Sequence, residues 1–249
     1  MASFSMGMPA LVRRLMTLFG STSTGQLKIL IPSTDLNMTT PSKFIPSTAS
    51  DFVGHGDFGA ATAARSLEAL VAQSRQNKNA SMAILFNGRP GIGKSALARW
   101  FLYDVLGCCK FSITRLNGTQ VNLDRVEDIA AGLPYRDLYA DYKAIWFEEC
   151  DQMSKAAQCR MLTLLDDLNE TPGTVILCTS NCALKDFEPR FSSRFTVFEL
   201  QPPSSDEIET LLRRWLQTEG AIKQIAQFAC GNVRTAIKDA DLQYAAEQS

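Results

Sequence analysis

The sequence predicts an α/β protein built on a parallel β-sheet and followed by a short helical segment. From about residue 49 to 200, short apolar runs alternate with helical patterns, which is typical of strand–helix–strand units. Pro202 and Pro203 end the last apolar run, because proline can neither donate in a sheet ladder nor continue inside a helix. The expected strands cover residues 82–86, 111–116, 143–148, 174–179 and 195–200, and the expected C-terminal helices cover 205–218, 222–229 and 233–246.

The chain before this region has a different composition. Residues 1–48 are rich in Ser, Thr, Pro and Met and contain no acidic residue before Asp35. We expect a flexible arm or a partner-docking segment, kept out of regular structure by its prolines. An organellar import leader is the alternative, because such leaders are also basic, Ser-rich and poor in acids. The expected domains are this arm (1–48), an α/β domain (49–201) and a helical domain (202–249).

The composition indicates an ordinary globular protein of a reducing compartment. Of its 249 residues, 45% are hydrophobic and 20% are charged, and the formal net charge is −1. This balance gives no overall attraction to nucleic acid, so any DNA contact must come from a local patch. No apolar run approaches the roughly 20 residues needed to cross a bilayer, so we expect no membrane contact. Seven cysteines without a C-x-x-C pair indicate buried free thiols, as in the cytoplasm or nucleus.

Residues 87–95 (NGRPGIGKS) have the spacing of a phosphate-binding P-loop, with Gly88, four residues, and then Gly93, Lys94 and Ser95. Small residues let backbone N–H groups converge on phosphate oxygens. An apolar strand precedes this loop and a helical pattern follows it over 96–106, which is the context that the motif needs. We therefore expect ATP and Mg²⁺, with Lys94 at the β and γ phosphates and the Ser95 hydroxyl on the metal.

Acidic and amide side chains follow two later strands. Glu148 and Glu149 end the strand over 143–148, and Asn181 follows the strand over 174–179. The carboxyl ends of parallel strands share one sheet edge, where a P-loop enzyme needs one carboxylate for Mg²⁺ and one to polarise the attacking water. We assign Glu148 to the metal and Glu149 to the water, and Asn181 to holding that water or the γ phosphate.

Two arginines complete the predicted site. Arg194 follows the strand of Asn181 closely enough to suggest a guanidinium that reaches a γ phosphate in a neighbouring subunit, with a surface salt bridge as the alternative. Arg234 opens the last predicted helix and could reach the same nucleotide from the helical domain. Its movement would couple the nucleotide state to the angle between the domains.

These stretches together resemble the AAA+ ATPases, and within them the clamp-loader branch, the small subunits of replication factor C and their bacterial relatives. The resemblance runs in order from about residue 46 to 245. It rests on residues 52–54 (similar to the adenine-contacting box), 87–95 (Walker A), 116–119 (the LNASD stretch), 145–151 (Walker B), 153–162 (the MT.DAQ.AL helix), Asn181 (sensor 1), 193–195 (the SRC arginine-finger motif) and 231–234 (sensor 2).

The resemblance implies a three-layer α/β/α domain with a helical lid, ATP and Mg²⁺ as ligands, and an oligomer in which Arg194 completes the site of the adjacent subunit. It also implies a set of nucleotide-contacting residues: Phe52, Val53, Gly54, Gly88, Pro90, Gly91, Ile92, Gly93, Lys94, Ser95, Ala96 and Arg234.

Three features depart from this family pattern. Glu148 stands where the family usually has Asp, which changes the geometry of metal binding. The lid looks abbreviated between Gln217 and Ile222. The sequence ends one helix after the sensor 2 motif, whereas clamp loaders continue into a helical collar. We therefore expect assembly through the ATPase domains or through the N-terminal arm.

Three uses of ATP remain open. The first is a DNA transaction, in which a clamp-loader-like or helicase-loader-like oligomer binds DNA when ATP-bound and places a client protein on it. The second is a protein-directed remodeller, and the third is a scaffold that binds ATP but scarcely hydrolyses it, as Glu148 suggests. The span 119–142 is too acidic to track phosphates, although the aromatics of 133–139 and Tyr142 could contact protein, stack on bases or simply be buried.

Overall fold

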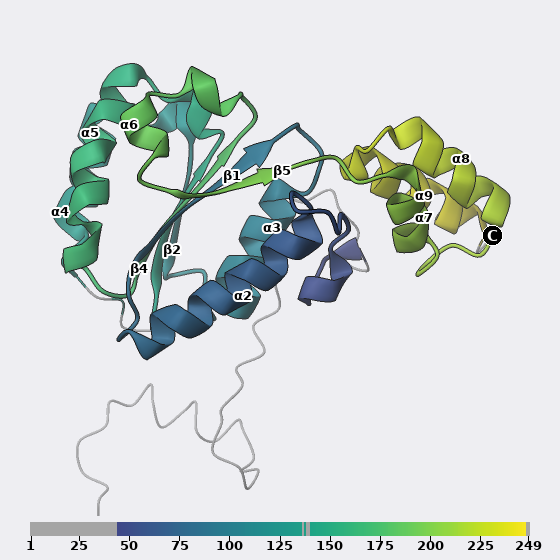
Figure 1. The fold of residues 1–249 in the computed structure, drawn as a ribbon, viewed down its shortest axis with the longest axis horizontal. Coiled ribbons are helices and arrows are strands. Elements are labelled where there is room, and N and C mark those ends of the chain that lie inside the picture. Colours follow the sequence, from purple (N-terminus) through teal and green to yellow (C-terminus); the bar gives the residue numbers. More distant parts are fainter. Residues whose placement is uncertain (1–43, 136, 138–139, 248–249) are drawn as a thin grey trace, which may run out of the picture. The chain divides into compact units, whose positions relative to one another are not determined.

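A five-stranded, all-parallel sheet with strand order β2-β3-β4-β1-β5 forms the α/β part of the chain (Figure 1). The computed structural model describes residues 44–135, 137 and 140–247. The strands are β1 (Met82–Gly88), β2 (Ile113–Asn117), β3 (Lys143–Glu148), β4 (Thr174–Ser180) and β5 (Thr196–Leu200). The predicted parallel sheet is confirmed, with strand ends that differ by at most about two residues, the usual uncertainty of such boundaries.

Helices cover both faces of this sheet, which confirms the predicted three-layer α/β/α arrangement (Figure 1). One face packs against α2 (Ala60–Gln76) and α3 (Lys94–Trp100), which continues into a π-helix, η3 (Phe101–Val105). The other face packs against α4 (Leu123–Gly132), α5 (Lys155–Asp166) and α6 (Pro189–Ser192). The 3₁₀ turns are η2 (Ala49–Asp51), η4 (Gly118–Gln120), η5 (Cys150–Gln152), η6 (Asp167–Glu170) and η7 (Leu184–Asp186).

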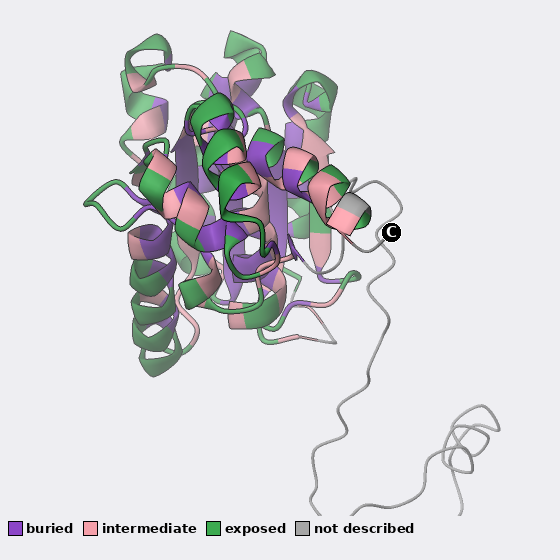
Figure 2. Ribbon diagram, turned by 90° about the vertical axis from the view of Figure 1, so that its right-hand side faces the viewer, coloured by how far each residue is buried: buried purple, intermediate pink, exposed green. Residues whose placement is uncertain are grey.

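The alternation of side chains explains why the central strands are apolar throughout. On β3, Ala144 and Trp146 pack on the α2–α3 side, whereas Ile145 and Phe147 pack on the α4–α5 side. Successive strand residues point to opposite faces, so a strand that is covered on both faces needs apolar residues at every position. The central strands are accordingly buried in Figure 2. By the same alternation, Glu148 lies on the face that α3 covers.

The predicted helical segment follows β5 and consists of α7 (Ser205–Leu212), α8 (Glu219–Ala229) and α9 (Val233–Glu247). Ser204 caps α7, since its Oγ accepts the Glu207 N–H at 3.2 Å and the Glu207 carboxylate accepts the Ser204 N–H at 2.9 Å. The helix predicted over 205–218 is too long, because α7 ends at Leu212. Arg213, just beyond that end, pairs with Glu209 of α7 and with Glu219 of α8. The next helix begins at Glu219, three residues before its predicted start.

The start of the folded chain differs from the prediction that the arm reaches residue 48. Phe44 is buried in the core of the helical segment, where its ring meets Trp215 edge-on at 4.5 Å between centroids. Asp51 also pairs with Arg214 at 3.0 Å. These contacts join sequence positions about 170 residues apart, which no local pattern reveals. The rest of the predicted arm, residues 1–43, lies outside the described residues.

No helix in the described part of the chain is long and apolar enough to span a membrane. All seven cysteines are free thiols. The prediction of buried thiols is right for Cys108, Cys150 and Cys178 and wrong for Cys159 and Cys230, which are exposed.

Candidate nucleotide-binding site

The loop between β1 and α3 has the backbone that a P-loop needs. Gly88, Gly91 and Gly93 adopt positive φ angles of 147°, 85° and 105°, a region that favours glycine. Gly93 is the N-cap residue of α3, so N–H groups of the first helical turn remain free for an anion. A Cβ atom on Gly88 would lie 2.4 Å from the Leu200 carbonyl oxygen, whereas the space beside Gly93 is open. The loop is therefore fixed against β5 and open at the start of α3.

Lys94 is buried in this loop with its charge only partly compensated. Its Nζ donates hydrogen bonds to the carbonyl oxygens of Gly88 (2.6 Å) and Arg89 (2.8 Å), and only 7% of the residue is exposed. Burial lowers the pKa of Lys94 to about 8, against the opposing effect of the Asp151 carboxylate. The Arg234 guanidinium lowers this pKa further and Glu149 raises it. Two cations thus lie close to the open end of the loop.

A triphosphate fits these residues. Phosphate oxygens would replace the two loop carbonyls as partners of Lys94 and would offset the repulsion between Lys94 and Arg234. One further polar atom lies at the base of the loop: the side-chain oxygen of Asn87 is buried and has no hydrogen-bond partner among the described residues. Such an atom accepts a hydrogen bond, so it suits a bound water rather than a phosphate.

We predict that ATP affinity falls as the pH rises above about 8. Phosphate oxygens bind the ammonium form of Lys94 better than the neutral amine. Since the pKa in the free protein is about 8, Lys94 is protonated below this pH and binds phosphate without taking up a proton. Above it, nucleotide binding must include proton uptake, and the Kd should rise by up to about tenfold per pH unit. Titration with a fluorescent ATP analogue between about pH 7 and about pH 9.5 measures this effect.

The matched control for this titration is Lys94→Arg, because a guanidinium stays charged over the whole range. This variant should bind more weakly but without the rise in Kd above about pH 8. A wild-type Kd that stays constant up to about pH 9.5 would contradict the lowered pKa.

The predicted metal ligand Glu148 is held by the neighbouring strand. Its Oε2 accepts a hydrogen bond from Arg115 Nε on β2 at 2.8 Å, and the Arg115 guanidinium stacks on the Trp146 ring at 4.4 Å. Arg115 lies on the side of β3 away from β1 and the P-loop. Ser95, the other predicted metal ligand, is half-buried in the first turn of α3, on the same face of the sheet as Glu148. The pair with Arg115 competes with metal binding by Glu148.

The predicted base Glu149 has an unusual backbone. It adopts φ 51° and ψ 50°, the left-handed region that non-glycine residues rarely enter. Its N–H donates to Thr179 Oγ1 on β4 at 3.3 Å. Its carbonyl lies against Gly118, where an added Cβ atom would come within 2.1 Å of that oxygen. Thr179 of β4 and Gly118 of the turn η4 after β2 thus confine the backbone of Glu149.

Asp151 is a site residue whose role the sequence alone does not reveal. Its Oδ1 accepts the Asn181 N–H at 3.1 Å, and its charge is the largest electrostatic influence on the pKa of Lys94. It therefore ties the residue after β4 to the loop after β3 and faces the P-loop lysine. The sequence shows that Asp151 belongs to the acidic stretch 148–151. It does not show which residue each of these acids contacts.

The helical segment contacts the P-loop through the start of α9. The Arg234 N–H donates to the Gly91 carbonyl at 3.0 Å, and an added Cβ atom on Gly91 would lie 2.1 Å from the Asn232 side chain. Arg234 itself is exposed. Pro90 and Ile92 belong to the same loop, and Ala96 belongs to the first turn of α3. The structure therefore brings Arg234 to the P-loop. Asn232 is a further contact that the sequence alone does not reveal.

The predicted adenine-contacting segment lies between α3 and α7. The Phe52 ring is buried against Trp100 at 5.3 Å, and the His55 N–H donates to Glu207 Oε1 at 2.7 Å. Val53 is buried, and Gly54 has a positive φ of 92°. Since the Phe52 ring packs inward, a contact of this segment with a base would come from the backbone of Val53 and Gly54.

Arg194 does not lie near the P-loop of its own chain. It precedes β5, which pairs Thr196 with Ile84 and Leu200 with Gly88. Arg194 therefore lies next to the start of β5, and Gly88 lies beside its end. The four-residue length of strand between these points corresponds to roughly 13 Å or more. Its guanidinium instead pairs with Asp166, the last residue of α5, at 2.6 and 2.8 Å. Within one chain, Arg194 thus forms the surface salt bridge that was the alternative expectation. A contact of Arg194 with phosphate would have to be made in another chain.

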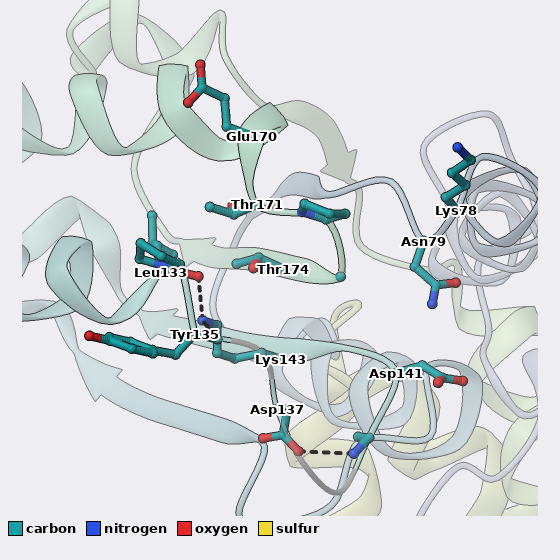
Figure 3. A pocket seen from close by; sticks show the side chains of 14 residues that line it. Lys78, Asn79, Leu133, Tyr135, Asp137, Asp141, Lys143, Glu170, Thr171 and Thr174 are labelled. Atoms are coloured by element: carbon teal, nitrogen blue, oxygen red, sulfur yellow. Dashed lines mark hydrogen bonds between the residues drawn. The ribbon is translucent and has the colours of Figure 1, made fainter.

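A pocket of 460 Å³ lies at the end of the sheet where the strands begin, opposite the P-loop end (Figure 3). Lys143 and Thr174, the first residues of β3 and β4, line it, so it is separate from the P-loop. Lys143 Nζ donates to the carbonyl oxygens of Gly132, Leu133 and Tyr135 at 2.9, 2.8 and 2.6 Å, which caps the end of α4 and uses all three of its protons.

The aromatics proposed as a contact surface separate into two groups. Tyr135 is 75% exposed, whereas Tyr142 is buried and its hydroxyl bonds Ser74 Oγ at 2.8 Å. Tyr142 is therefore a core residue. Of the alternatives left open for it, burial is confirmed and contact with a protein or a base is wrong. Tyr139 lies outside the described residues.

Comparison with known families agrees with this geometry. Residues 84–203 match the model of the family described as ATPase family associated with various cellular activities (AAA). The chain therefore contains an AAA ATPase domain. The chain is also similar, at low identity, to replication factor C small subunits, which supports the clamp-loader resemblance. The protein from Thermofilum pendens is 29% identical over 175 residues, which are 64% of this chain and 52% of that protein.

A second replication factor C small subunit, from Methanococcus maripaludis, is 26% identical over 207 residues, covering 78% of this chain and 61% of the relative. The chain thus spans about half to three-fifths of the length of these relatives. Among solved structures, the Holliday junction branch migration motor RuvB of Thermotoga maritima superimposes with a TM-score of 0.64 at 17% identity, covering 80% of this chain and 64% of RuvB. A DNA polymerase III gamma subunit-related protein from Thermotoga maritima gives 0.56 at 20% identity, covering 71% and 57%. These two likenesses concern the fold alone.

Proposed function

We propose that this protein hydrolyses ATP in an oligomer and uses the hydrolysis in a DNA transaction, as a clamp-loader-like or helicase-loader-like assembly factor. The observation that carries the proposal is the buried Lys94 of the P-loop, next to Asp151 and Glu149, in a chain whose Arg194 lies far from that loop. In this proposal the P-loop of one chain binds phosphate, and Arg194 of another chain completes the site. Distant sequence similarity to replication factor C small subunits supports the DNA role.

In this proposal the P-loop residues bind the nucleotide. Lys94 leaves the Gly88 and Arg89 carbonyls and contacts the β and γ phosphates, while backbone N–H groups of the loop and of the first turn of α3 cradle them. Bound Mg²⁺ would neutralise charge on the phosphates. Ser95 and Glu148 are its proposed ligands, and Glu148 must give up its bond to Arg115 to serve.

The residues after β3 and β4 act on the attacking water. Glu149 takes its proton, and Asn181 holds the water by hydrogen bonds without adding charge. The bond from the Asn181 N–H to Asp151 fixes this residue relative to the loop that carries Glu149. Arg234 contacts the nucleotide from α9, so that closing of the helical segment depends on the nucleotide.

The proposed domains are the arm (1–48, of which Phe44 packs in the core of the helical segment), the ATPase domain (49–201) and the helical lid (202–249). Oligomer contacts would run through the ATPase domains, with Arg194 in trans and an unidentified client protein bound elsewhere. The free thiols fit a reducing compartment such as the cytoplasm or nucleus.

Two other functions have a specific observation in their favour. A scaffold with slow turnover is supported by the Arg115–Glu148 pair, since a metal ligand that is bound to an arginine holds Mg²⁺ less well. A protein-directed remodeller is supported by the exposed Tyr135, which lies in an acidic region that suits protein better than DNA.

The test of the DNA role is fluorescence anisotropy of labelled single-stranded, duplex and primer-template DNA, titrated with the Glu149→Gln protein. We expect binding with ATP but not with ADP, and weaker binding at higher salt because phosphate contacts release counterions. Lys94→Ala, which should not hold ATP, is the control for the nucleotide dependence. Absence of binding in every nucleotide state contradicts the DNA role and favours the protein-directed remodeller.

A further inference from the structure

The segment that carries Arg194 is anchored in the core although Arg194 itself lies at the surface. Phe187, Phe191 and Phe195 are buried, and their rings form a continuous row with centroids 5.7 and 5.0 Å apart. Phe191 lies in α6, is fully buried and belongs to the hydrophobic cluster that covers the α4–α5 side of the sheet. The Arg194 N–H also donates to the Phe191 carbonyl at 3.3 Å. The backbone at Arg194 therefore has a fixed place relative to the sheet.

The side chain of Arg194 is fixed as well. Its Nε and Nη2 donate to the two carboxylate oxygens of Asp166 at 2.6 and 2.8 Å, and its Nη1 donates to the Arg190 carbonyl at 2.7 Å. The hydrogen bonds from Arg194 keep the pKa of Asp166 below its ordinary value, so the carboxylate stays ionised near neutral pH. Bidentate pairing of this kind defines the plane of the guanidinium, unlike contact with a single oxygen.

These contacts leave part of the guanidinium free. A guanidinium has five N–H donors, of which Asp166 and Arg190 use three. Asp166 occupies the edge formed by Nε and Nη2. Each terminal nitrogen therefore keeps one N–H, which can be offered to a further acceptor such as a phosphate oxygen. The pair with Asp166 thus orients Arg194 without saturating it.

We propose that Asp166 is a positioning residue, which holds the Arg194 guanidinium in the orientation in which it enters the nucleotide site of the neighbouring subunit. This inference rests on the proposed function of Arg194 in trans. A side chain with four rotatable bonds loses much conformational freedom when it is ordered at an interface. Asp166 removes most of that freedom beforehand, so the Arg194 guanidinium is already aligned when the subunits come into contact.

The test is Asp166→Asn in the full chain, which keeps the shape of the side chain but removes the charge and one acceptor. We expect the kcat for ATP to fall about tenfold, as for other losses of alignment away from the reacting atoms. The KM for ATP should stay unchanged, because each chain binds ATP through its own P-loop. Asp167→Asn is the matched control, since this neighbouring carboxylate is exposed and belongs to the turn after α5. Asp166→Glu should restore part of the kcat.

A double-mutant cycle separates positioning from a merely structural role. If Asp166 acts through Arg194, then Asp166→Asn has no further effect on turnover in the Arg194→Ala background. An equal tenfold loss in both backgrounds overturns the inference, as does a rise in kcat, which would make Asp166 a competitor of the phosphate. Wild-type turnover by Arg194→Ala alone has a different meaning: it refutes the proposed trans site itself.

Discussion

Arg194→Ala should lower ATP turnover by about a thousandfold or more while leaving ATP affinity close to that of the wild type. An arginine that reaches the transferred phosphoryl group stabilises charge that develops only in the transition state, so its loss affects kcat rather than binding. Because Arg194 precedes β5, away from Gly88 of its own chain, we expect this contact between subunits. Steady-state turnover and titration with a fluorescent ATP analogue measure the two quantities.

The matched control for this variant is Arg190→Ala. Arg190 is four residues earlier on the same segment and is exposed, and only its main-chain carbonyl takes part in holding Arg194. Its replacement should leave turnover within about twofold, as for a surface substitution away from the site. If Arg194→Ala hydrolyses ATP at the wild-type rate, or if a strictly monomeric protein does so, the shared site is wrong.

Glu149→Gln should lower turnover by about a hundredfold to ten-thousandfold and leave the protein in its ATP-bound state. The amide keeps the size of the side chain but cannot accept the proton of the attacking water. The left-handed backbone of Glu149, held by Thr179 and Gly118, places this side chain independently of its charge, so the variant should fold normally. Single-turnover hydrolysis after mixing with ATP separates the chemical step from release of ADP.

Glu68→Gln is a suitable control, because Glu68 is an exposed carboxylate on α2 that has no place in the proposed site. It should hydrolyse ATP as the wild type does. Wild-type turnover in Glu149→Gln would instead show that another carboxylate is the base, and Asp151 would then be the first to test because of its place beside Lys94.

The strands and the P-loop could be predicted from the sequence because their signals are local. A strand that is covered on both faces appears as a continuous apolar run, and the P-loop requires glycine at fixed spacing. The end of α7 was not visible, since helical pattern continues past Leu212 while the chain turns there. Arg213 pairs there with Glu209 of α7 and Glu219 of α8, and a local pattern does not reveal such contacts between helices.

The partners of the site residues could not be predicted for the same reason. Residue type identified Lys94, Glu148, Glu149, Asn181, Arg194 and Arg234 as candidates, and their roles stay predictions. Their neighbours Asp151, Arg115 and Asp166 depend on how strands and helices meet, which one sequence does not reveal. The burial of Phe44 and Tyr142 likewise results from packing between segments distant in the chain.

The central claim is that one chain supplies the P-loop and Glu149 while another supplies Arg194, and a mixing experiment tests it most directly. Arg194→Ala and Glu149→Gln proteins, each nearly inactive alone, are combined in equal amounts and ATP turnover is measured. In mixed oligomers, some sites combine the P-loop and Glu149 of an Arg194→Ala subunit with the Arg194 of a Glu149→Gln subunit. Random assembly should therefore restore roughly a quarter of the wild-type turnover. Turnover no greater than the sum of the two separate variants would contradict a site shared between chains.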